Sequence, residues 1–347
     1  MKFTVERAPP RRDRELMLVL GGAGFFKVIA AAHELHLFEY LYAHRGATAE
    51  EIAQGLTLPL YSVQTLLMAC AALRFVERSG SGYQNVAWVN GAFAGPSPTF
   101  TTVIEGFDRL LYQPLFHLTE SLRRGTNVGL EYFPGTGRTI YERISAYPEL
   151  EATFHAWMSN LSALGLPPVL VNALGQSRAL LDVGGGDGTN AILLARAHPQ
   201  LRVTILDLPS VCERATARIA SEGLSAQIAA IPCDIRVDPF PPGADAVLFS
   251  RIFNIYSEDQ NRSFVARSAA CLPPGGQLIV FPSMVADDDE TGPLSAAFLS
   301  LYYLCLATGE GRVYPPASYE AWFREAGFAS LECLVNERDD AVFIGRR

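Results

Sequence analysis

The sequence has little positive charge and no strongly basic segment. Lysine and arginine number 28 against 36 aspartates and glutamates in 347 residues, which gives a formal net charge of −8. No basic run is longer than a pair such as Arg11-Arg12 or Arg123-Arg124. Proteins that bind nucleic acid need a concentrated basic surface to neutralise phosphates. We therefore expect no nucleic-acid partner.

The sequence also lacks a long uninterrupted hydrophobic run. The longest apolar segment, residues 16–32, is broken by Gly21, Gly22, Gly24 and Lys27. It falls short of the roughly 20 apolar residues that cross a bilayer. The N-terminus shows no charged start followed by an apolar core and a cleavage site, which a secretion signal requires. We expect a cytoplasmic protein without a membrane partner.

Cysteine and histidine are sparse, and neither has metal-ligand spacing. The six histidines form no HxxxH or HxD pattern, and the cysteines form no CxxC pair. This spacing argues against a zinc site and against a disulfide framework, so we expect no metal. We interpret the cysteines as buried thiols; they are Cys70, Cys212, Cys233, Cys271, Cys305 and Cys333.

The first third of the chain has the pattern of a winged helix. Apolar positions recur at helical spacing over residues 16–42, and Thr48 with Glu51 forms a capping box ahead of a short helix. A second helix over 59–73 precedes two short strands joined by a Gly-Ser-Gly turn. This second helix carries almost no positive charge, which favours a scaffold or dimerisation role over DNA binding.

The rest of the chain has the pattern of an α/β protein. Hydrophobic residues make up 49% of the sequence, enough for a large core, and the length predicts two domains. Residues 100–163 have a helical pattern, and beyond them short β-branched segments alternate with longer helical ones, as in a parallel sheet covered by helices. We predict a winged-helix domain at 1–100, linking helices at 101–166 and an α/β domain at 167–347.

A nucleoside site is indicated where the first strand of this sheet ends. The segment LLDVGGGDG, residues 180–188, leads an apolar strand into a glycine-rich turn and a helix start, where backbone N–H groups can approach a ligand. Asp207 ends the next strand about 25 residues after Asp182, where a carboxylate can bind both ribose hydroxyls. Asp234 ends a third strand and could orient an adenine amino group.

The turn favours S-adenosylmethionine (SAM) over a dinucleotide. It reads GGGDG rather than GxGxxG, and the Asp187 carboxylate would repel a pyrophosphate. SAM has no phosphate and carries a sulfonium cation. The sequence therefore predicts a SAM site.

These segments resemble the class I small-molecule O-methyltransferases of bacteria and plants. The resemblance rests on DVGGGDG and LDLPSV, on FHAWMSNLS before them, and on CLPPGG and YEAWFREAGF after them. It implies a Rossmann-like seven-stranded sheet with one antiparallel strand, the product S-adenosylhomocysteine (SAH), and a homodimer through the N-terminal domain. It assigns cofactor contacts to Gly184, Gly186, Asp207, Leu208, Asp234, Ile235, Ser250, Arg251, Met158 and Ser162.

The resemblance fails at the catalytic base. Family members deprotonate a phenol with a histidine in a segment like LHDWSDE, which here reads RIFNIYSED, residues 251–259. Asn254 stands in place of the histidine and Tyr256 in place of the tryptophan. The two carboxylates that brace the histidine align with Ser283 and Val313. The acid/base triad is therefore absent as a set.

Three accounts of this loss stay open. Proximity and orientation can supply most of the acceleration, with Asn254 positioning the acceptor by a hydrogen bond. The base can lie elsewhere, at Tyr256, His117 or His155, although packed structural roles are favoured for all three. The enzyme can also use SAM without methylating anything.

We predict methyl transfer to the oxygen of a hydroxylated aromatic or heteroaromatic small molecule, such as a phenol, a quinone precursor or a hydroxypyrrole, in specialised metabolism. Local similarity of RIFxxY and FPSMV to bacteriochlorophyll ring methyltransferases keeps carbon methylation open. A SAM-binding enzyme that catalyses a rearrangement and a SAM-sensing winged-helix regulator are further alternatives. Aromatic and flexible side chains are expected to line the acceptor pocket; they are Phe154, Trp157, Met158, Phe253, Phe298 and Tyr302, with Asn254 and Tyr256 as catalytic candidates.

Overall fold

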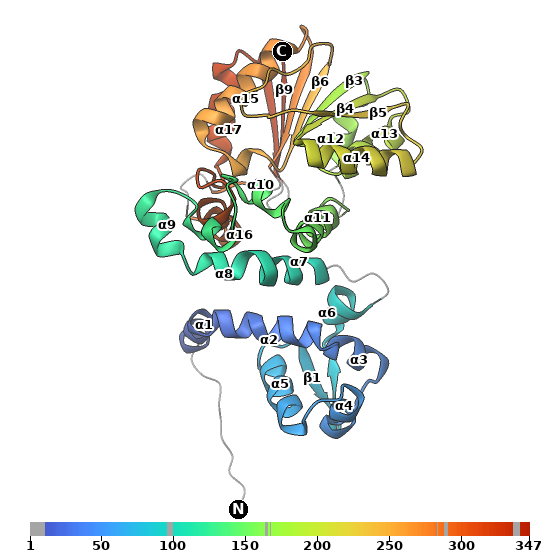
Figure 1. The fold of residues 1–347 in the computed structure, drawn as a ribbon, viewed down its shortest axis with the longest axis vertical. Helices are drawn as coiled ribbons and strands as arrows, with labels where there is room; N and C mark the ends of the chain where they lie inside the picture. The colour runs from blue at the N-terminus through green and yellow to red at the C-terminus, as the bar shows by residue number, and fades with distance from the viewer. Residues whose placement is uncertain are drawn as a thin grey trace, which may run out of the picture. The chain divides into compact units, whose positions relative to one another are not determined.

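The computed structural model describes residues 11–95, 100–163, 166, 168–282, 284–287, 291–335 and 341–347. The chain divides into two compact units, Met1–Tyr112 and Gln113–Arg347 (Figure 1). The first is mainly helical, and the second holds a seven-stranded sheet. The predicted fold class is confirmed.

The first unit has the helix–helix–wing order that its sequence predicts. A capping box forms at Thr48, whose backbone N donates to Glu51 Oε2 at 2.7 Å while Glu51 N donates to Thr48 Oγ1 at 3.3 Å. The two strands of the wing pair antiparallel. The elements are α1 (Arg11–Leu20), α2 (Gly22–Glu34), α3 (Leu37–Ala43), α4 (Ala49–Gly55), α5 (Leu60–Ala72), β1 (Val76–Ser79) and β2 (Gly82–Asn85).

This unit runs on past residue 100, where we expected its boundary, to Tyr112. The reason is that the helix after residue 100 packs back on α2: Lys27 Nζ lies 2.6 Å from Asp108 Oδ1, and the Phe26 and Tyr112 rings stack at 4.0 Å. The elements concerned are α6 (Ala87–Val89), η1 (Asn90–Ala94), α7 (Thr101–Gly106) and η2 (Phe107–Leu111).

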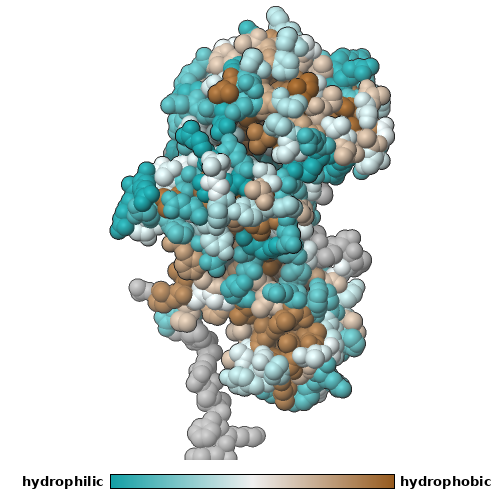
Figure 2. Space-filling model, in the orientation of Figure 1, coloured by the Kyte–Doolittle hydropathy of each residue, from teal (hydrophilic) through white to brown (hydrophobic). Residues whose placement is uncertain are grey.

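Apolar side chains gather on the surface of the first unit (Figure 2). In α1, Leu16, Met17, Val19 and Leu20 are each more than half exposed. In the described part of the chain no single helix is long and apolar enough to span a membrane, although the bent pairs α1–α2 and α4–α5 reach that length and composition together.

The second unit begins with helices that adjoin the sheet and are joined later in the chain by α16 and η5. Among them, α10 packs on α11, and η5 contacts η3, α9 and α10. Their bounds are α8 (Tyr112–Leu115), α9 (Leu118–Arg124), η3 (Val128–Tyr132), α10 (Ile140–Ile144), α11 (Pro148–Ala163), α12 (Pro168–Ala173), α16 (Leu294–Tyr302) and η5 (Tyr303–Ala307).

The sheet has the strand order β5-β4-β3-β6-β7-β9-β8, with β9 antiparallel to both of its neighbours and the remaining pairs parallel. This confirms the one antiparallel strand near the edge. The strands are β3 (Ala179–Val183), β4 (Arg202–Asp207), β5 (Ile228–Pro232), β6 (Ala246–Ser250), β7 (Gln277–Phe281), β8 (Ser330–Val335) and β9 (Ala341–Arg346).

Helices bury both faces of this sheet, which explains why its central strands read as continuous apolar runs. Leu181 and Phe249 face a cluster that includes residues of α15 (Glu258–Cys271) and α17 (Pro316–Glu325). Leu180 and Leu248 face the opposite cluster, to which α12, α13 (Thr189–Ala197) and α14 (Pro209–Ser221) contribute. The adjacent ends of β3, β4 and β6 therefore form a rigid edge on which a site can be built.

Candidate active site

The glycine-rich turn between β3 and α13 adopts a backbone that side chains would prevent. Gly184 has φ +71°, and a Cβ added there would lie 2.3 Å from Ile252 Cδ1. Gly186 has φ +61° and donates its N–H to Asp207 Oδ2 at 2.9 Å. The turn is thus tied to the end of β4. Leu208 N donates to Asp207 Oδ1 at 2.8 Å, so the carboxylate is oriented from two sides.

Below the turn lies a buried carboxylate. Asp182 is 0% exposed, and among the described residues neither of its oxygens finds a hydrogen-bond donor. Burial, with the nearby Asp207 charge, raises the pKa of Asp182 to about 7. Asn190 donates to Ser250 Oγ at 3.0 Å, but its own buried Oδ1 also accepts no hydrogen bond. Unpartnered acceptors are costly inside a protein, so this edge of the sheet fits a ligand that brings donors and positive charge.

Asp187, the carboxylate inside the turn, does not have the role that the sequence analysis gave it, which was to repel a pyrophosphate. Its Oδ2 accepts from Ser159 Oγ of α11 at 2.7 Å and from Arg218 of α14, and its Oδ1 accepts from Thr189 Oγ1 at 2.7 Å. Burial would raise the pKa of Asp187, but the hydrogen bonds from Ser159 and Thr189 outweigh it and lower the pKa. Asp187 thus links α11, α13 and α14. Because Arg218 balances its charge, Asp187 is not a free anion that would repel a pyrophosphate.

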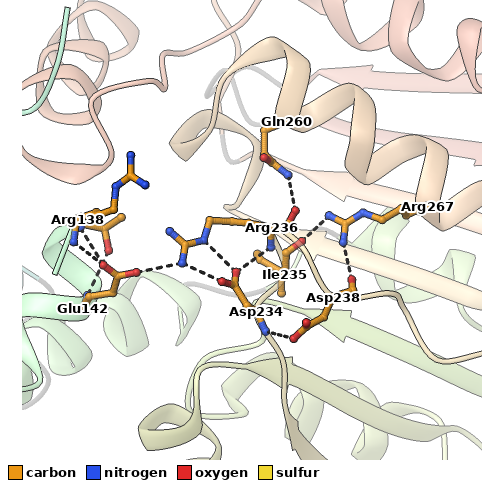
Figure 3. Close-up of polar contacts among 9 residues, drawn as sticks. Arg138, Glu142, Asp234, Ile235, Arg236, Asp238, Gln260 and Arg267 are labelled. Atoms are coloured by element: carbon orange, nitrogen blue, oxygen red, sulfur yellow. Dashed lines mark hydrogen bonds and ion pairs between the residues drawn. The ribbon is translucent and has the colours of Figure 1, made fainter.

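Asp234 belongs to a polar network after β5 (Figure 3). Arg236 Nε donates to Asp234 Oδ1, and Arg236 NH2 donates to Asp234 Oδ2, both at 2.9 Å. The same NH2 lies 3.1 Å from Glu142 Oε1 of α10. These hydrogen bonds lower the pKa of Asp234. The residue is a fixed anion whose orientation depends on Arg236.

The other predicted cofactor contacts differ in position. Ser250 is buried beside Asn190, and Ile235 is buried in the core cluster at the edge of the turn. Arg251 adopts φ +61°, and its guanidinium lies 5.5 Å from the Phe281 ring centroid. The charge of Arg251 lowers the pKa of Tyr303, but burial of this phenol has the larger effect and raises it. Met158 is half-buried on α11. The side chain of Ser162 lies outside the described residues.

Four tyrosines gather on the other side of the site, and two of them were not predicted. Tyr141 of α10 and Tyr302 of α16 place their hydroxyl oxygens 3.3 Å apart, and Tyr303 and Tyr256 are near enough to raise the Tyr141 pKa further beyond the effect of burial. Burial also raises the pKa of Tyr302 to about 12. The helix changes from α to π at Tyr303, which allows consecutive tyrosines to face one cluster. We name Tyr141, Tyr256, Tyr302 and Tyr303 the tyrosine cluster.

Two of the predicted acceptor walls extend this cluster along α11. The Phe154 ring meets Tyr141 edge-on at 5.7 Å and Trp157 at 6.4 Å. Both Phe154 and Trp157 are buried. Phe298 is half-buried on α16, one helical turn before Tyr302.

Phe253 and Asn254 do not occupy the positions that the sequence analysis assigned to them. Phe253 is 0% exposed and packs among Phe249, Tyr319 and Trp322, so it is a core residue rather than an acceptor wall. Asn254 is 1% exposed; its Nδ2 donates to the Pro282 and Met284 carbonyls at 3.2 and 3.3 Å. Its Oδ1 accepts from Tyr319 at 3.0 Å. The amide is therefore fully used by protein partners, and it links the segment after β7 to Tyr319 of α17.

The alternative bases are also poorly suited to remove a proton. Burial raises the pKa of Tyr256, and the phenol keeps its proton at neutral pH. His155 Nε2 lies 2.6 Å from Arg214, and burial with that charge lowers its pKa. His117 is exposed at the start of α9. Val313 is buried and has no ionisable group, while Ser283 lies outside the described residues.

Among the described residues, no group of three or more His, Cys, Asp or Glu side chains is placed to hold a metal ion.

A Rossmann-like sheet with this glycine turn, preceded by a winged-helix unit, defines the class of SAM-dependent methyltransferases. The chain belongs to the O-methyltransferase domain family, which matches residues 115–329, and the O-methyltransferase dimerisation domain matches residues 17–91. SAM is the cofactor and SAH the product. The unpartnered oxygens of Asp182 and Asn190 fit this cationic, amine-bearing molecule.

Three relatives are similar over nearly the whole chain. L-tyrosine C(3)-methyltransferase of Streptomyces lavendulae is 33% identical over 90% of this chain and 86% of its own length. The 3-hydroxy-5-methyl-1-naphthoate 3-O-methyltransferase of Streptomyces sahachiroi is 33% identical over 94% and 93%. The structure of the SAM-dependent methyltransferase SibL is 38% identical, covers 96% of this chain and 98% of that chain, and superposes with a TM-score of 0.82. The protein is thus a small-molecule methyltransferase of specialised metabolism.

We predict that Asn254→Ala acts mainly on stability. The substitution leaves the Tyr319 hydroxyl, the buried Pro282 carbonyl and the half-buried Met284 carbonyl without their partner, which should lower the free energy of unfolding by about 2 kcal/mol. Denaturant unfolding followed by fluorescence measures this, with Asn172→Ala on the exposed side of α12 as a control that stays within about 0.5 kcal/mol of the parent. Unchanged stability with a loss of turnover would instead place Asn254 at the acceptor.

SAM binding should weaken as the pH falls through 7. The Asp182 carboxylate takes up a proton there and loses the charge that attracts a cation, so the Kd for SAM should rise about tenfold from pH 8 to pH 6. Titration calorimetry at several pH values tests this. Asp182→Asn should bind SAM more weakly and with little pH dependence, whereas Glu213→Gln on the exposed face of α14 should keep the parent's response. An equal pH response in Asp182→Asn would contradict the assignment.

Proposed function

We propose that the enzyme transfers the methyl group of SAM to a ring carbon beside the hydroxyl of a small phenol, and that a tyrosine-like amino acid is the acceptor to test first. The observation that carries this proposal is the hydrogen bonding of Asn254. This residue stands where the family resemblance expects the base, and its amide is buried in hydrogen bonds to protein groups. The neighbouring side chains of the tyrosine cluster are phenols, and burial raises their pKa values.

Oxygen and carbon methylation make different demands on such a site. A phenol oxygen becomes a good nucleophile when a base removes its proton before or during transfer. A ring carbon attacks with the π electrons of the neutral or hydrogen-bonded phenol, and its proton leaves afterwards. The cation formed on the ring is a strong acid, so a neutral hydroxyl or water suffices to accept that proton. A site of protonated phenols therefore suits the carbon reaction.

The reaction balances without a further reagent. The ring carbon forms a bond to the methyl carbon as the methyl–sulfur bond breaks, and sulfur keeps the electron pair to give SAH. The ring then loses a proton and recovers its aromaticity. The protein contributes orientation and exclusion of water, with Tyr141 and Tyr302 hydrogen-bonded to the acceptor hydroxyl and Phe154 against its ring.

The cofactor roles are part of the same proposal. The Asp207 carboxylate would bind the ribose hydroxyls, Asp234 the adenine amino group, and Asp182 with Asn190 the amine of the methionine part. Gly184, Gly186 and Leu208 would supply the close backbone approach, with Ile235, Ser250, Arg251 and Met158 around them. Each of these residues lies in the second unit, at the ends of β3 to β6, at the start of α13 or on α11.

The two relatives named for their substrates support different atoms. The tyrosine enzyme methylates carbon and the hydroxynaphthoate enzyme methylates oxygen, at equal identity to this chain. Both act on hydroxylated rings, which supports that class of acceptor. Oxygen methylation of a naphthol-like acid is the second candidate, because the hydroxynaphthoate enzyme aligns with 94% of this chain and the tyrosine enzyme with 90%.

We also propose that the protein is a homodimer formed through the first unit. A dimerisation-domain match over residues 17–91 supports this, together with the exposed apolar side chains of α1. Single exposed apolar residues are normal on a protein surface, but a group of neighbouring ones indicates an interaction site. A second copy of the chain would bury this group.

Ring deuteration distinguishes the two methylated atoms. L-Tyrosine deuterated at both ring carbons beside the hydroxyl, incubated with SAM and enzyme, should gain a methyl group and lose one deuteron. The same experiment with a hydroxynaphthoate deuterated beside its hydroxyl extends the test to the second candidate. Mass spectrometry measures both. A methylated product that keeps all its ring deuterium would show oxygen methylation.

Tyr141→Phe should reduce kcat/KM for the acceptor by about three- to tenfold, since it removes one neutral hydrogen bond to the phenol. Its Kd for SAM should stay within about twofold of the parent. Tyr147→Phe serves as the matched control because the Tyr147 hydroxyl donates to the Pro134 carbonyl at 2.8 Å, outside the tyrosine cluster. Steady-state kinetics decides the matter: equal kcat/KM in Tyr141→Phe would remove this hydroxyl from the acceptor site.

A further inference from the structure

The loop after β5 is held in place by several independent contacts (Figure 3). Asp234 N donates to Asp238 Oδ2 at 2.8 Å, and Gln260 Nε2 of α15 donates to the Arg236 carbonyl at 3.1 Å. Arg267, also of α15, donates to the carbonyls of Ile235 and Asp238. These contacts anchor the backbone of the loop to the sheet domain. The Arg236 side chain leaves this anchored loop and reaches α10.

Helix α10 depends on outside contacts because it has only five residues, Ile140–Ile144. Isolated helices of this length are unstable in water. A capping box holds its start: Glu142 N donates to Thr139 Oγ1 at 3.2 Å, and Thr139 N donates to Glu142 Oε2 at 3.3 Å. Arg143 ties it to the Leu130 and Phe133 carbonyls at 2.7 and 2.8 Å. Arg236 supplies a further tie, at Glu142 Oε1.

Glu142 and Tyr141 are consecutive, so their side chains leave the helix about 100° apart. Glu142 faces Arg236, while Tyr141 faces Tyr302 and Phe154. A rotation or shift of α10 that follows Arg236 therefore moves the Tyr141 hydroxyl within the tyrosine cluster. A single guanidinium thus joins the carboxylate proposed for adenine to the helix that carries a proposed acceptor contact.

The three charged groups that connect Asp234 to α10 are only partly exposed, so solvent screens their interactions less than it would at an open surface. The side chains of Arg236, Glu142 and Asp234 are 33%, 27% and 33% exposed. Arg236 bonds both oxygens of Asp234 through Nε and NH2, a two-point contact that fixes the plane of the guanidinium. A change in the Asp234 carboxylate is then transmitted to NH2, which also contacts Glu142.

We propose that Arg236 is a positioning residue that couples cofactor binding to the acceptor site: adenine at Asp234 orders α10 and so sets Tyr141 for the acceptor. This inference rests on the proposed function for the roles of Asp234 and Tyr141. It predicts that SAH alone tightens α10. By linkage, an acceptor that orders Tyr141 also tightens SAH binding by the same factor.

Hydrogen exchange of the intact protein, with and without saturating SAH, tests the coupling without needing an acceptor. In the parent, SAH should slow exchange of the α10 amides by about fivefold or more. Arg236→Met should bind SAH, as calorimetry will show, but its α10 amides should exchange at rates that SAH changes by less than about twofold. Protection of α13, beside the glycine turn, reports cofactor binding in both proteins.

Two further variants separate coupling from simple damage. Glu142→Gln keeps the capping box, since glutamine serves at this helix position, but loses the charge facing Arg236, so it should also lose the SAH effect on α10. Gln260→Met removes another contact of Arg236, at its carbonyl, without touching Glu142, and should keep the SAH effect. Methyl transfer to carbon or to oxygen leaves these expectations unchanged.

The coupling is supported if Arg236→Met and Glu142→Gln both lose the protection of α10 while α13 is still protected. It is overturned if SAH protects α10 equally in Arg236→Met and the parent, or if SAH leaves α10 unprotected in the parent while protecting α13. Arg236→Lys provides a graded check. Its ammonium keeps the charge but not the two-point contact, so it should retain only part of the effect.

Discussion

The proposed cofactor site is built around a buried carboxylate for which the described part of the chain supplies no hydrogen-bond partner. Asp182 is the next-to-last residue of β3, lies under the glycine turn and is fully shielded from solvent. An unpaired carboxylate in such a place costs free energy, and its raised pKa expresses that cost. The surrounding structure has to be rigid enough to keep it there. The parallel sheet supplies that rigidity, and in the proposed binding mode the amine of the cofactor would supply the missing positive charge.

Around this carboxylate, the charged side chains lie on one side of the proposed site and the neutral aromatic side chains lie on the other. The cofactor side holds anions whose geometry is set by backbone N–H groups, as at Asp207, or by guanidinium groups, as at Asp187 and Asp234. The proposed acceptor side holds aromatic rings and phenol hydroxyls, and burial raises the pKa values of Tyr141 and Tyr302. Methyl transfer between the two sides needs alignment and the exclusion of water, which the packed aromatic residues would supply in the proposed reaction.

The sequence predicted the features that short segments carry by themselves. The capping box at Thr48, the wing, the glycine turn and the strand-ending aspartates all depend on neighbours within a few residues, and the structure shows the same elements. The tyrosine cluster was missed in part: Tyr256 and Tyr302 were predicted, whereas Tyr141 and Tyr303 were not. The cluster joins side chains from three separate segments, which no local pattern indicates. Asn254 was recognised as a substitution, but its partners Tyr319 and Pro282 are distant in sequence.

At the position where the family resemblance expects a histidine, the Asn254 side chain is occupied by contacts within the protein. The Asn254 amide joins the end of β7 to α17 through Tyr319, and the same α17 residue stacks on Phe343 of β9. Asn254 is almost fully enclosed, and Val313, which aligns with a position where the family resemblance expects a carboxylate, is buried and offers no charge. The Asn254 position is therefore part of the packed core. In the proposed reaction a ring carbon attacks before any proton leaves, so this position needs no base.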